Sequence, residues 1–188
     1  MPKIKSSRIR INNQPFKSKT PNCYQDKIRK EAEKTIKTKI LISGSRINSF
    51  LKCRPHFIGC YAEDELSSLS IHSFPCFMII NIDQKHMKGS HWIALGIFRQ
   101  TIEIIDPLGF KLFNWERIPC HLLNFLHIMS QSRDISILKP IQSDNSILCA
   151  YFCISYVINR KLQSLNQFQN RFSNDVDKND SILLKSFH

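Results

Sequence analysis

The sequence predicts an α+β fold in which a central sheet containing antiparallel strands packs on a buried helix. Three segments rich in β-forming residues lie between residues 74 and 106, and only Arg99 and Gln100 separate the last two, which is hairpin length. Downstream, residues 145–160 are apolar nearly all round, which is typical of a helix buried against a sheet. A hydrophobic share of 42% in 188 residues is enough for one compact core.

The sequence pattern predicts the following segments, helices and strands in order. Residues 1–24 contain few apolar side chains, so we expect a flexible segment there. A basic helix with one apolar stripe is expected over residues 25–41, because apolar side chains recur every four positions at Ile28, Ala32, Ile36 and Ile40. A short helix is expected over 46–52, strands over 74–82, 90–98 and 101–106, and helices over 118–130 and 145–160.

These elements predict three segments, namely a basic and partly flexible arm over 1–42, one folded domain over 43–165, and a polar C-terminal tail or peripheral lobe over 166–188. The longest nearly apolar run has 12 residues, too few for a bilayer span, so no membrane partner is expected. No secretory signal is visible and the seven cysteines form no C-x-x-C pair, which favours a reducing, intracellular setting with free thiols.

The positive charge of the chain is concentrated near its start. Residues 1–40 hold 12 basic and 3 acidic side chains, a net +9, whereas residues 41–188 hold 15 and 12, a net +3. This asymmetry predicts non-specific DNA binding by the arm, although a solvated charged tail or a nuclear-import signal fits equally well. The candidate DNA-binding residues are Lys3, Lys5, Arg8, Arg10, Lys27, Arg29 and Lys30.

Common cofactor and metal motifs are missing. With five glycines the chain contains neither G-x-x-x-x-G-K-S/T nor G-x-G-x-x-G, which argues against kinases and dehydrogenases, and no cofactor is expected to be required. Cys149 and Cys153 lie one helical turn apart, and Cys120, His121 and His127 share another predicted helix. Structural zinc normally shows paired short ligand spacings, which are absent, so no metal site is expected.

Three residues could form a nucleophilic centre. His91 begins one predicted strand and Asp106 ends the next, so the acid could orient the imidazole across neighbouring strands. Cys149 lies near the start of the apolar helix, where the helix dipole and unpaired N–H groups favour a thiolate. Each residue alone is more often structural, since buried cysteines usually pack and an aspartate before proline is common in turns. The order His, Asp, Gln, Cys favours catalysis.

Four ordered blocks resemble the adenovirus-type cysteine proteases and their relatives encoded by polinton-like viruses and transposons. Residues 55–61 (PHFIGCY) are similar to the family's P-x-F-x-G-x-Y/F block, and residues 89–92 (GSHW) to its G-x-H-W block. Residues 106–110 (DPLGF) are similar to D/E-P-x-G-F, and residues 142–153 (QSDNSILCAYFC) to Q-x-x-x-S-x-x-C-G-x-F-C. The resemblance covers about residues 43–160 and is specific to the family rather than to one protein.

The resemblance implies a papain-like core in permuted order and a cysteine endopeptidase. It makes Cys149 the nucleophile, His91 the general base, Asp106 the acid that orients the imidazole, and Gln142 the side-chain donor of the oxyanion hole. Two features depart from the family pattern. Ala150 stands where glycine normally follows the nucleophile, and the stretch before Gln142 lacks the cysteine through which adenoviral enzymes bind an activating peptide.

The resemblance also implies capsid or core precursors as substrates, cleavage after a small residue such as glycine, and a virion and host-nucleus location. A monomer is expected. The resemblance also allows viral DNA or a peptide to stimulate the protease activity. Two alternatives remain at this point. One is a peptidase that removes ubiquitin-like modifiers, a group in the wider clan that shares the order H-W, D, Q, C. The other is a basic nucleic-acid-packaging virion protein with an inactive protease-like fold.

Overall fold

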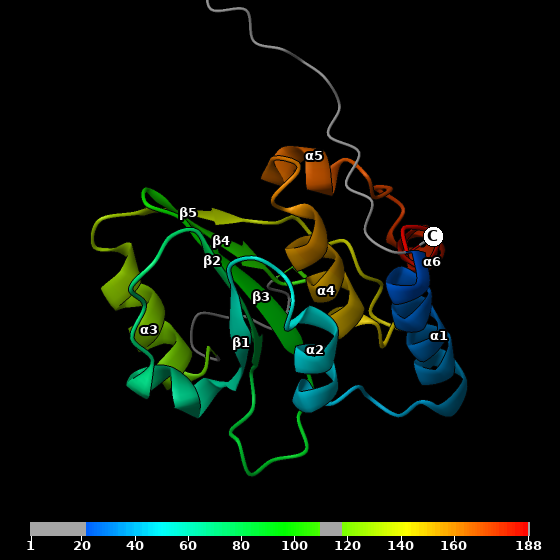
Figure 1. Cartoon of the computed structure of the whole chain (residues 1–188), viewed down its shortest axis with the longest axis horizontal. Helices are drawn as coiled ribbons and strands as arrows, with labels where there is room; N and C mark the ends of the chain where they lie inside the picture. Colours follow the sequence, from blue (N-terminus) through cyan, green and yellow to red (C-terminus); the bar gives the residue numbers. More distant parts are fainter. Residues whose placement is uncertain (1–21, 110–117, 188) are drawn as a thin grey trace, which may run out of the picture.

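A five-stranded mixed sheet lies at the centre of the fold (Figure 1). The structure, a computed structural model, describes residues 22–109 and 118–187. The spatial order of the strands is their order in the sequence, and the two outer pairs are parallel whereas the inner pairs are antiparallel. The strands are β1 (Phe57–Ala62), β2 (Cys76–Asn81), β3 (Trp92–Ile97), β4 (Thr101–Ile105) and β5 (Asp134–Ile137). The predicted α+β class with antiparallel strands in the sheet is confirmed.

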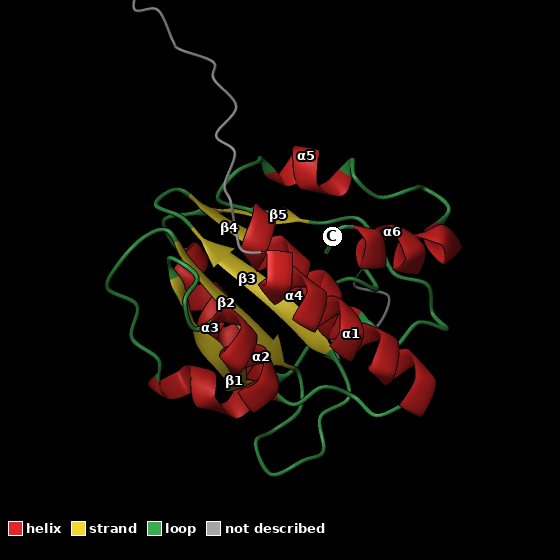
Figure 2. Ribbon diagram, turned by 45° about the vertical axis from the view of Figure 1, so that its right-hand side comes forward, coloured by secondary structure: helices red, strands yellow, loops and turns green. Residues whose placement is uncertain are grey.

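Both faces of the sheet are covered, which explains the nearly continuous apolar strands. Alternate residues of β2 point to opposite sides, so that Phe77 and Ile79 belong to one buried cluster whereas Met78 and Ile80 belong to the other. Helices lie on either side of the sheet in Figures 1 and 2.

One face carries α4 (Cys149–Asn159), the predicted apolar helix, in which every residue from Cys149 to Ile158 is buried. The other face carries α3 (Cys120–Ser130) and the 3₁₀ helix η1 (Glu63–Ser68), whose Leu66 shares a core with Leu122. Within the described part of the chain, no helix is both long enough and apolar enough to span a membrane.

The segments predicted to flank the domain contribute to its core. The predicted basic helix is α1 (Asn22–Thr38), and its stripe residues Ile28 and Ala32 are fully buried in the cluster around α4, whereas Ile40 lies beyond the helix and is exposed. The arm therefore does not extend to residue 42 as a separate unit, because its helix packs on the domain.

At the other end, residues 166–187 pack against the same cluster instead of forming a free tail. Their core contributions include Phe168, Leu183 and Phe187, each at most 1% exposed. The helices near the C-terminus are short, namely α5 (Leu165–Gln169), η3 (Val176–Lys178) and α6 (Asn179–Lys185).

The short helix predicted near residue 46 is α2 (Gly44–Leu51). The side chain of Ser43 caps α2 by accepting a hydrogen bond from the Arg46 N–H.

Candidate active site

His91 and Asp106 meet at one end of the sheet, as the sequence predicts. His91 immediately precedes β3 and Asp106 immediately follows β4, and these antiparallel neighbours bring the two side chains together. His91 Nε2 donates a hydrogen bond of 2.8 Å to Asp106 Oδ1, and the side chains are 5% and 0% exposed. This contact leaves Nδ1 of His91 as the ring nitrogen available to a nucleophile.

The Asp-Pro-Leu-Gly segment forms a turn that fixes the acid. Asp106 Oδ1 also accepts a hydrogen bond from the Leu108 N–H at 3.0 Å, and the Gly109 N–H donates to the Asp106 carbonyl at 2.9 Å. Gly109 has φ +73, a left-handed conformation that glycine adopts without strain, and a Cβ there would collide with Pro140. Phe110, the last residue of this block, lies outside the described residues.

The same turn holds Gln142 beside the acid. The carbonyl of Pro107 accepts hydrogen bonds from the Ile141 N–H at 2.9 Å and from the Gln142 N–H at 2.8 Å. The Gln142 side chain is buried, and its Nε2 donates to the Ser146 carbonyl at 2.8 Å, whereas its Oε1 has no hydrogen-bond partner. Because a primary amide has two N–H groups, Gln142 retains a second donor for an oxyanion.

Cys149 is the first residue of α4 and is 4% exposed. At this position the backbone N–H groups of Cys149 and Ala150 have no intrahelical acceptor, and the helix dipole favours negative charge nearby. Ala150 lies in the first turn of α4 and is not among the described residues with positive φ. The alanine that replaces the family glycine therefore does not strain the turn, since a helical backbone suits it.

The pKa of His91 indicates a charged imidazole in the neutral range. Burial lowers this pKa, but hydrogen bonds with Asp106 and Cys149 and the negative charges of both groups raise it more, to about 9. The hydrogen bonding with Cys149 brings the predicted nucleophile into the same group as His91 and Asp106. A buried thiol, an imidazole and a carboxylate in this order can carry out nucleophilic catalysis.

The thiols of Cys153, Cys60 and Cys76, which are buried or partly buried, are less suited to act as nucleophiles. Cys153, one turn further along α4, is fully buried and donates a weak hydrogen bond of 3.4 Å to the Trp92 carbonyl. Burial raises the pKa of Cys153 well above its usual range, and it raises the pKa of Cys60 to about 12 and of Cys76 to about 11. None of these thiols forms a thiolate readily.

The C-terminal helix supports the loop that carries Gln142, which the sequence does not reveal. Ser146 Oγ donates to Asp180 Oδ1 at 2.8 Å and accepts from the Leu148 N–H at 3.2 Å. Asn179, fully buried, donates through Nδ2 to the Ile141 carbonyl at 3.0 Å. These contacts join residues far apart in the chain and follow no short motif, so no sequence signal marks them.

The candidate DNA-binding residues are only partly described. Lys3, Lys5, Arg8 and Arg10 lie outside the described residues, whereas the other three are on α1. Lys27 and Lys30 are exposed, but Arg29 pairs with Asp26 at 3.2 Å and with Glu33 at 3.3 Å. Arg29 is thus partly neutralised and is a weaker candidate than its neighbours.

Comparison with known proteins adds little to this geometry. No protein-family model matches the chain, and a search of curated proteins finds no match. Among solved structures, one that is similar is titled "AvrA delL154 with IP6, CoA", with 13% sequence identity and a TM-score of 0.39. The match covers 86% of this chain and 66% of the other, so this chain spans slightly less than two thirds of that structure. A likeness at this level carries no argument about activity, substrate or partner.

Proposed function

We propose that the protein is a cysteine endopeptidase that processes viral capsid or core precursor proteins through an acyl-enzyme. The observation that carries this proposal is the buried group in which Asp106 binds Nε2 of His91 and Cys149 interacts with the same imidazole at the start of α4. The viral precursor as substrate rests on the family resemblance of the four sequence blocks.

In this mechanism His91 takes the thiol proton of Cys149 on Nδ1 before substrate binds, so that the resting pair is a thiolate and an imidazolium, and the thiolate sulfur attacks the carbonyl carbon of the scissile peptide bond. The imidazolium then gives its proton to the leaving nitrogen as the C–N bond breaks, which leaves a thioester on Cys149. Water next loses a proton to His91 and attacks the thioester, and the carboxylic acid product departs as the thiolate reforms. Asp106 keeps the imidazole oriented and stabilises its charged form.

The negative oxygen of each tetrahedral intermediate needs hydrogen-bond donors. The backbone N–H of Cys149 and the second N–H of Gln142 Nε2 are the two candidates. Because Gln142 is fixed through its backbone to Pro107 and through its side chain to Ser146, it is ordered before substrate binds. A preorganised donor stabilises the transition state without a further entropic cost.

A hollow of about 440 Å³, lined in part by residues next to His91 in the sequence, offers room for part of a peptide substrate. Its lining includes Gly89 and Trp92, which flank His91 in the sequence, together with Gly44 and Cys60. A Cβ on Gly44 would lie 3.3 Å from the Trp92 ring, so the lining is tightly packed there. Small residues near the scissile bond are what the family resemblance implies for a substrate bound there.

The proposal is tested by incubating the protein with candidate capsid and core precursors and mapping the new termini by mass spectrometry. We expect cuts after a small residue, chiefly glycine, that are absent with Cys149→Ala and retained with Cys53→Ala, a change of an exposed thiol. Cuts after bulky or charged residues would contradict the specificity. Hydrolysis of a ubiquitin-like fluorogenic reporter without precursor cleavage would indicate a deconjugating peptidase instead. No turnover of either substrate would favour the packaging role.

A further inference from the structure

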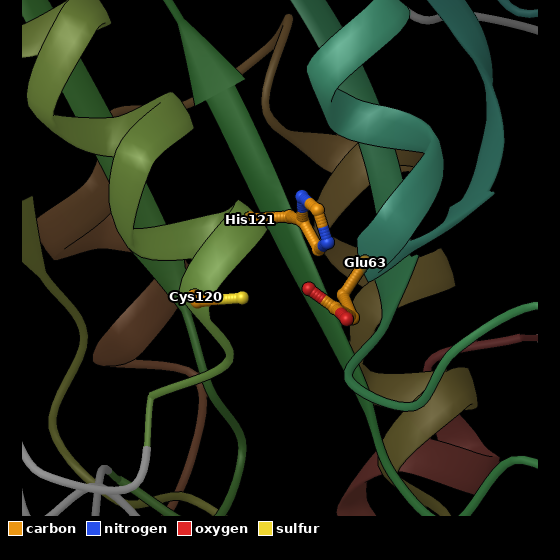
Figure 3. A group of neighbouring side chains, drawn as sticks. All are labelled: Glu63, Cys120 and His121. Atoms are coloured by element: carbon orange, nitrogen blue, oxygen red, sulfur yellow. The ribbon is translucent and has the colours of Figure 1, made fainter.

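Away from the proposed active site, three side chains of different chemistry converge between η1 and the start of α3. Glu63, Cys120 and His121 each offer one ligand atom, and these atoms lie within 4.8 Å of one another (Figure 3). Figure 3 shows the carboxylate of Glu63 extending toward the Cys120 thiol and the His121 ring. Among the described residues, these three side chains form the one group of His, Cys, Asp or Glu residues whose ligand atoms lie close enough together to hold a metal ion.

The fold brings these residues together from distant parts of the sequence. Glu63 follows β1 directly and begins η1, whereas Cys120 and His121 are the first two residues of α3. Leu66 of η1 and Leu122 of α3 lie in one buried cluster, which fixes the two elements against each other. The ligand atoms are therefore presented by packed elements rather than by a loose loop.

The Glu63 side chain gives a second and independent indication of a cation. Glu63 is only 3% exposed, and its Oε2 is buried without a hydrogen-bond partner. A buried carboxylate oxygen without a partner is costly, and natural proteins resolve the cost with a hydrogen bond, an ion pair or a metal. A cation placed among the three side chains would satisfy this oxygen.

We propose that Glu63, Cys120 and His121 bind a divalent transition-metal ion, with Zn²⁺ the best match. Thiolate and imidazole ligands suit zinc and disfavour Mg²⁺ and Ca²⁺, which prefer oxygen. A carboxylate and a thiolate supply two negative charges that balance the ion, and Cys120 releases its proton on binding. Cys120 is exposed and leaves the fourth tetrahedral position open to water. The sequence predicted no metal because Glu63 is remote from Cys120 and His121 in the chain, so that no short ligand spacing reveals the site.

Binding requires only a small adjustment of these side chains. Ligand atoms around tetrahedral zinc are about 3.3 to 3.8 Å apart, as follows from bond lengths of about 2.0 to 2.3 Å. The separation of up to 4.8 Å thus has to shrink by about 1 Å. The exposed Cys120 and the half-buried His121 can move in by rotating about their side-chain bonds. The bound ion would join η1 to α3 on the face of the sheet opposite α4.

The test uses the full chain carrying Cys149→Ala, so that the thiol of the proposed active site cannot compete for metal. Co²⁺ is titrated as a spectroscopic probe, and Zn²⁺ is then added as a competitor. We expect one equivalent of Co²⁺ to produce a sulfur-to-cobalt charge-transfer band and intense tetrahedral visible bands, which Zn²⁺ abolishes. Zn²⁺ should also raise the melting temperature, because it binds only the folded protein.

Three variants and two matched controls locate the site. Cys120→Ser should remove the charge-transfer band, and Glu63→Gln and His121→Gln should weaken binding by more than about 100-fold, since even an outer-sphere partner is worth about 10- to 100-fold. Cys53→Ser, another exposed thiol, and His127→Gln, on the same helix, should bind like the parent. Circular dichroism checks that each apo variant folds, and Cys120→Ser decides alone should Glu63→Gln unfold. A parent spectrum without a thiolate band, or a band unchanged by Cys120→Ser, would overturn the proposal.

Discussion

The ionisation of His91 links the geometry of the proposed site to a measurable property. The imidazole is buried, and burial alone would lower its pKa, yet the hydrogen bonds and charges of Asp106 and Cys149 raise it to about 9. An imidazolium below that pH holds the proton that the leaving nitrogen needs. Activity should therefore persist into mildly alkaline solution and fall as the pH rises through about 9.

Replacing the acid should shift this limb of the pH profile. Asp106→Asn removes a negative charge and the acceptor that favour the imidazolium, so the pKa of His91 falls and the alkaline loss of activity moves to lower pH. The variant should retain part of its activity, because Cys149 and His91 remain. The measurement is kcat/KM against pH for parent and variant with one peptide. An alkaline limb at the same pH in both proteins would show that Asp106 does not tune His91.

Gln142 should act on the chemical step rather than on substrate binding. Gln142→Ala removes one oxyanion donor, which in known enzymes is worth about 10²- to 10³-fold in rate, so kcat should fall by that order with KM little changed. Steady-state kinetics with a fluorogenic peptide measure both constants, and Gln131→Ala, at an exposed position beyond α3, serves as the control. A rise in KM at constant kcat would assign Gln142 to substrate binding.

The four proposed catalytic residues were predictable because each lies in a short sequence block. His91 and Asp106 also sit at the ends of strands that the sequence predicts, and a short connection between two such strands brings these ends side by side. The supporting contacts of Asn179 and Asp180 could not be predicted, since they depend on how the C-terminal helix packs on a remote loop.

At the level of elements, the sequence predicts the helices and strands that have a strong hydrophobic pattern and misses the strands that lack one. The strands β2, β3 and β4 are long apolar runs, and α4 is apolar all round because both of its sides are buried. In contrast, β1 is half-buried throughout and contains Gly59, and β5 has four mostly exposed residues. Such edge strands form because they pair with a neighbouring strand, and their own residues show no hydrophobic pattern from which a strand could be predicted.

A buried ion pair connects the sheet to the end of α4, and its loss should be costly. Glu103 on β4 accepts two hydrogen bonds of 2.6 Å from Arg160 and one of 2.7 Å from the Tyr156 hydroxyl. Arg160→Met leaves the Glu103 carboxylate buried without its cation, which should lower the free energy of unfolding by about 3 to 5 kcal/mol. Tyr156→Phe should cost about 2 kcal/mol, the value of a hydrogen bond to a charged group.

Urea denaturation of both variants measures these changes, with Lys161→Met, an exposed neighbour of Arg160, as the control. The control should change the free energy of unfolding by less than about 0.5 kcal/mol, as is usual for exposed positions. Equal losses in Arg160→Met and Lys161→Met would mean that the ion pair adds no stability to the fold.

For the whole molecule, the uneven charge makes a prediction about nucleic acid. We propose that the first residues bind DNA without sequence preference, because residues 1–40 carry a net +9. Since α1 belongs to the core, a deletion to residue 42 would damage the fold, and charge neutralisation is the cleaner test. Changing Lys3, Lys5, Arg8 and Arg10 to Gln should reduce the slope of log K against log salt by about 3.6, at about 0.9 per phosphate contact.

The matched control neutralises four exposed lysines of the folded part, namely Lys139, Lys161, Lys178 and Lys185. Binding to a short duplex, followed by fluorescence anisotropy at several salt concentrations, gives the slopes. We expect the control to keep the slope of the parent. The same slope after neutralisation of the first four basic residues would place DNA binding elsewhere on the chain.

The central claim is that Cys149 is the activated thiol, and the most direct measurement is labelling of the native protein with a thiol-reactive peptide that ends in glycine. Mass spectrometry then identifies the modified cysteine among the seven. We expect one label on Cys149, lost in Cys149→Ala, strongly reduced in His91→Ala and retained in Cys153→Ala. Labelling of the exposed Cys53 or Cys120 instead, with the same yield in Cys149→Ala, would contradict it.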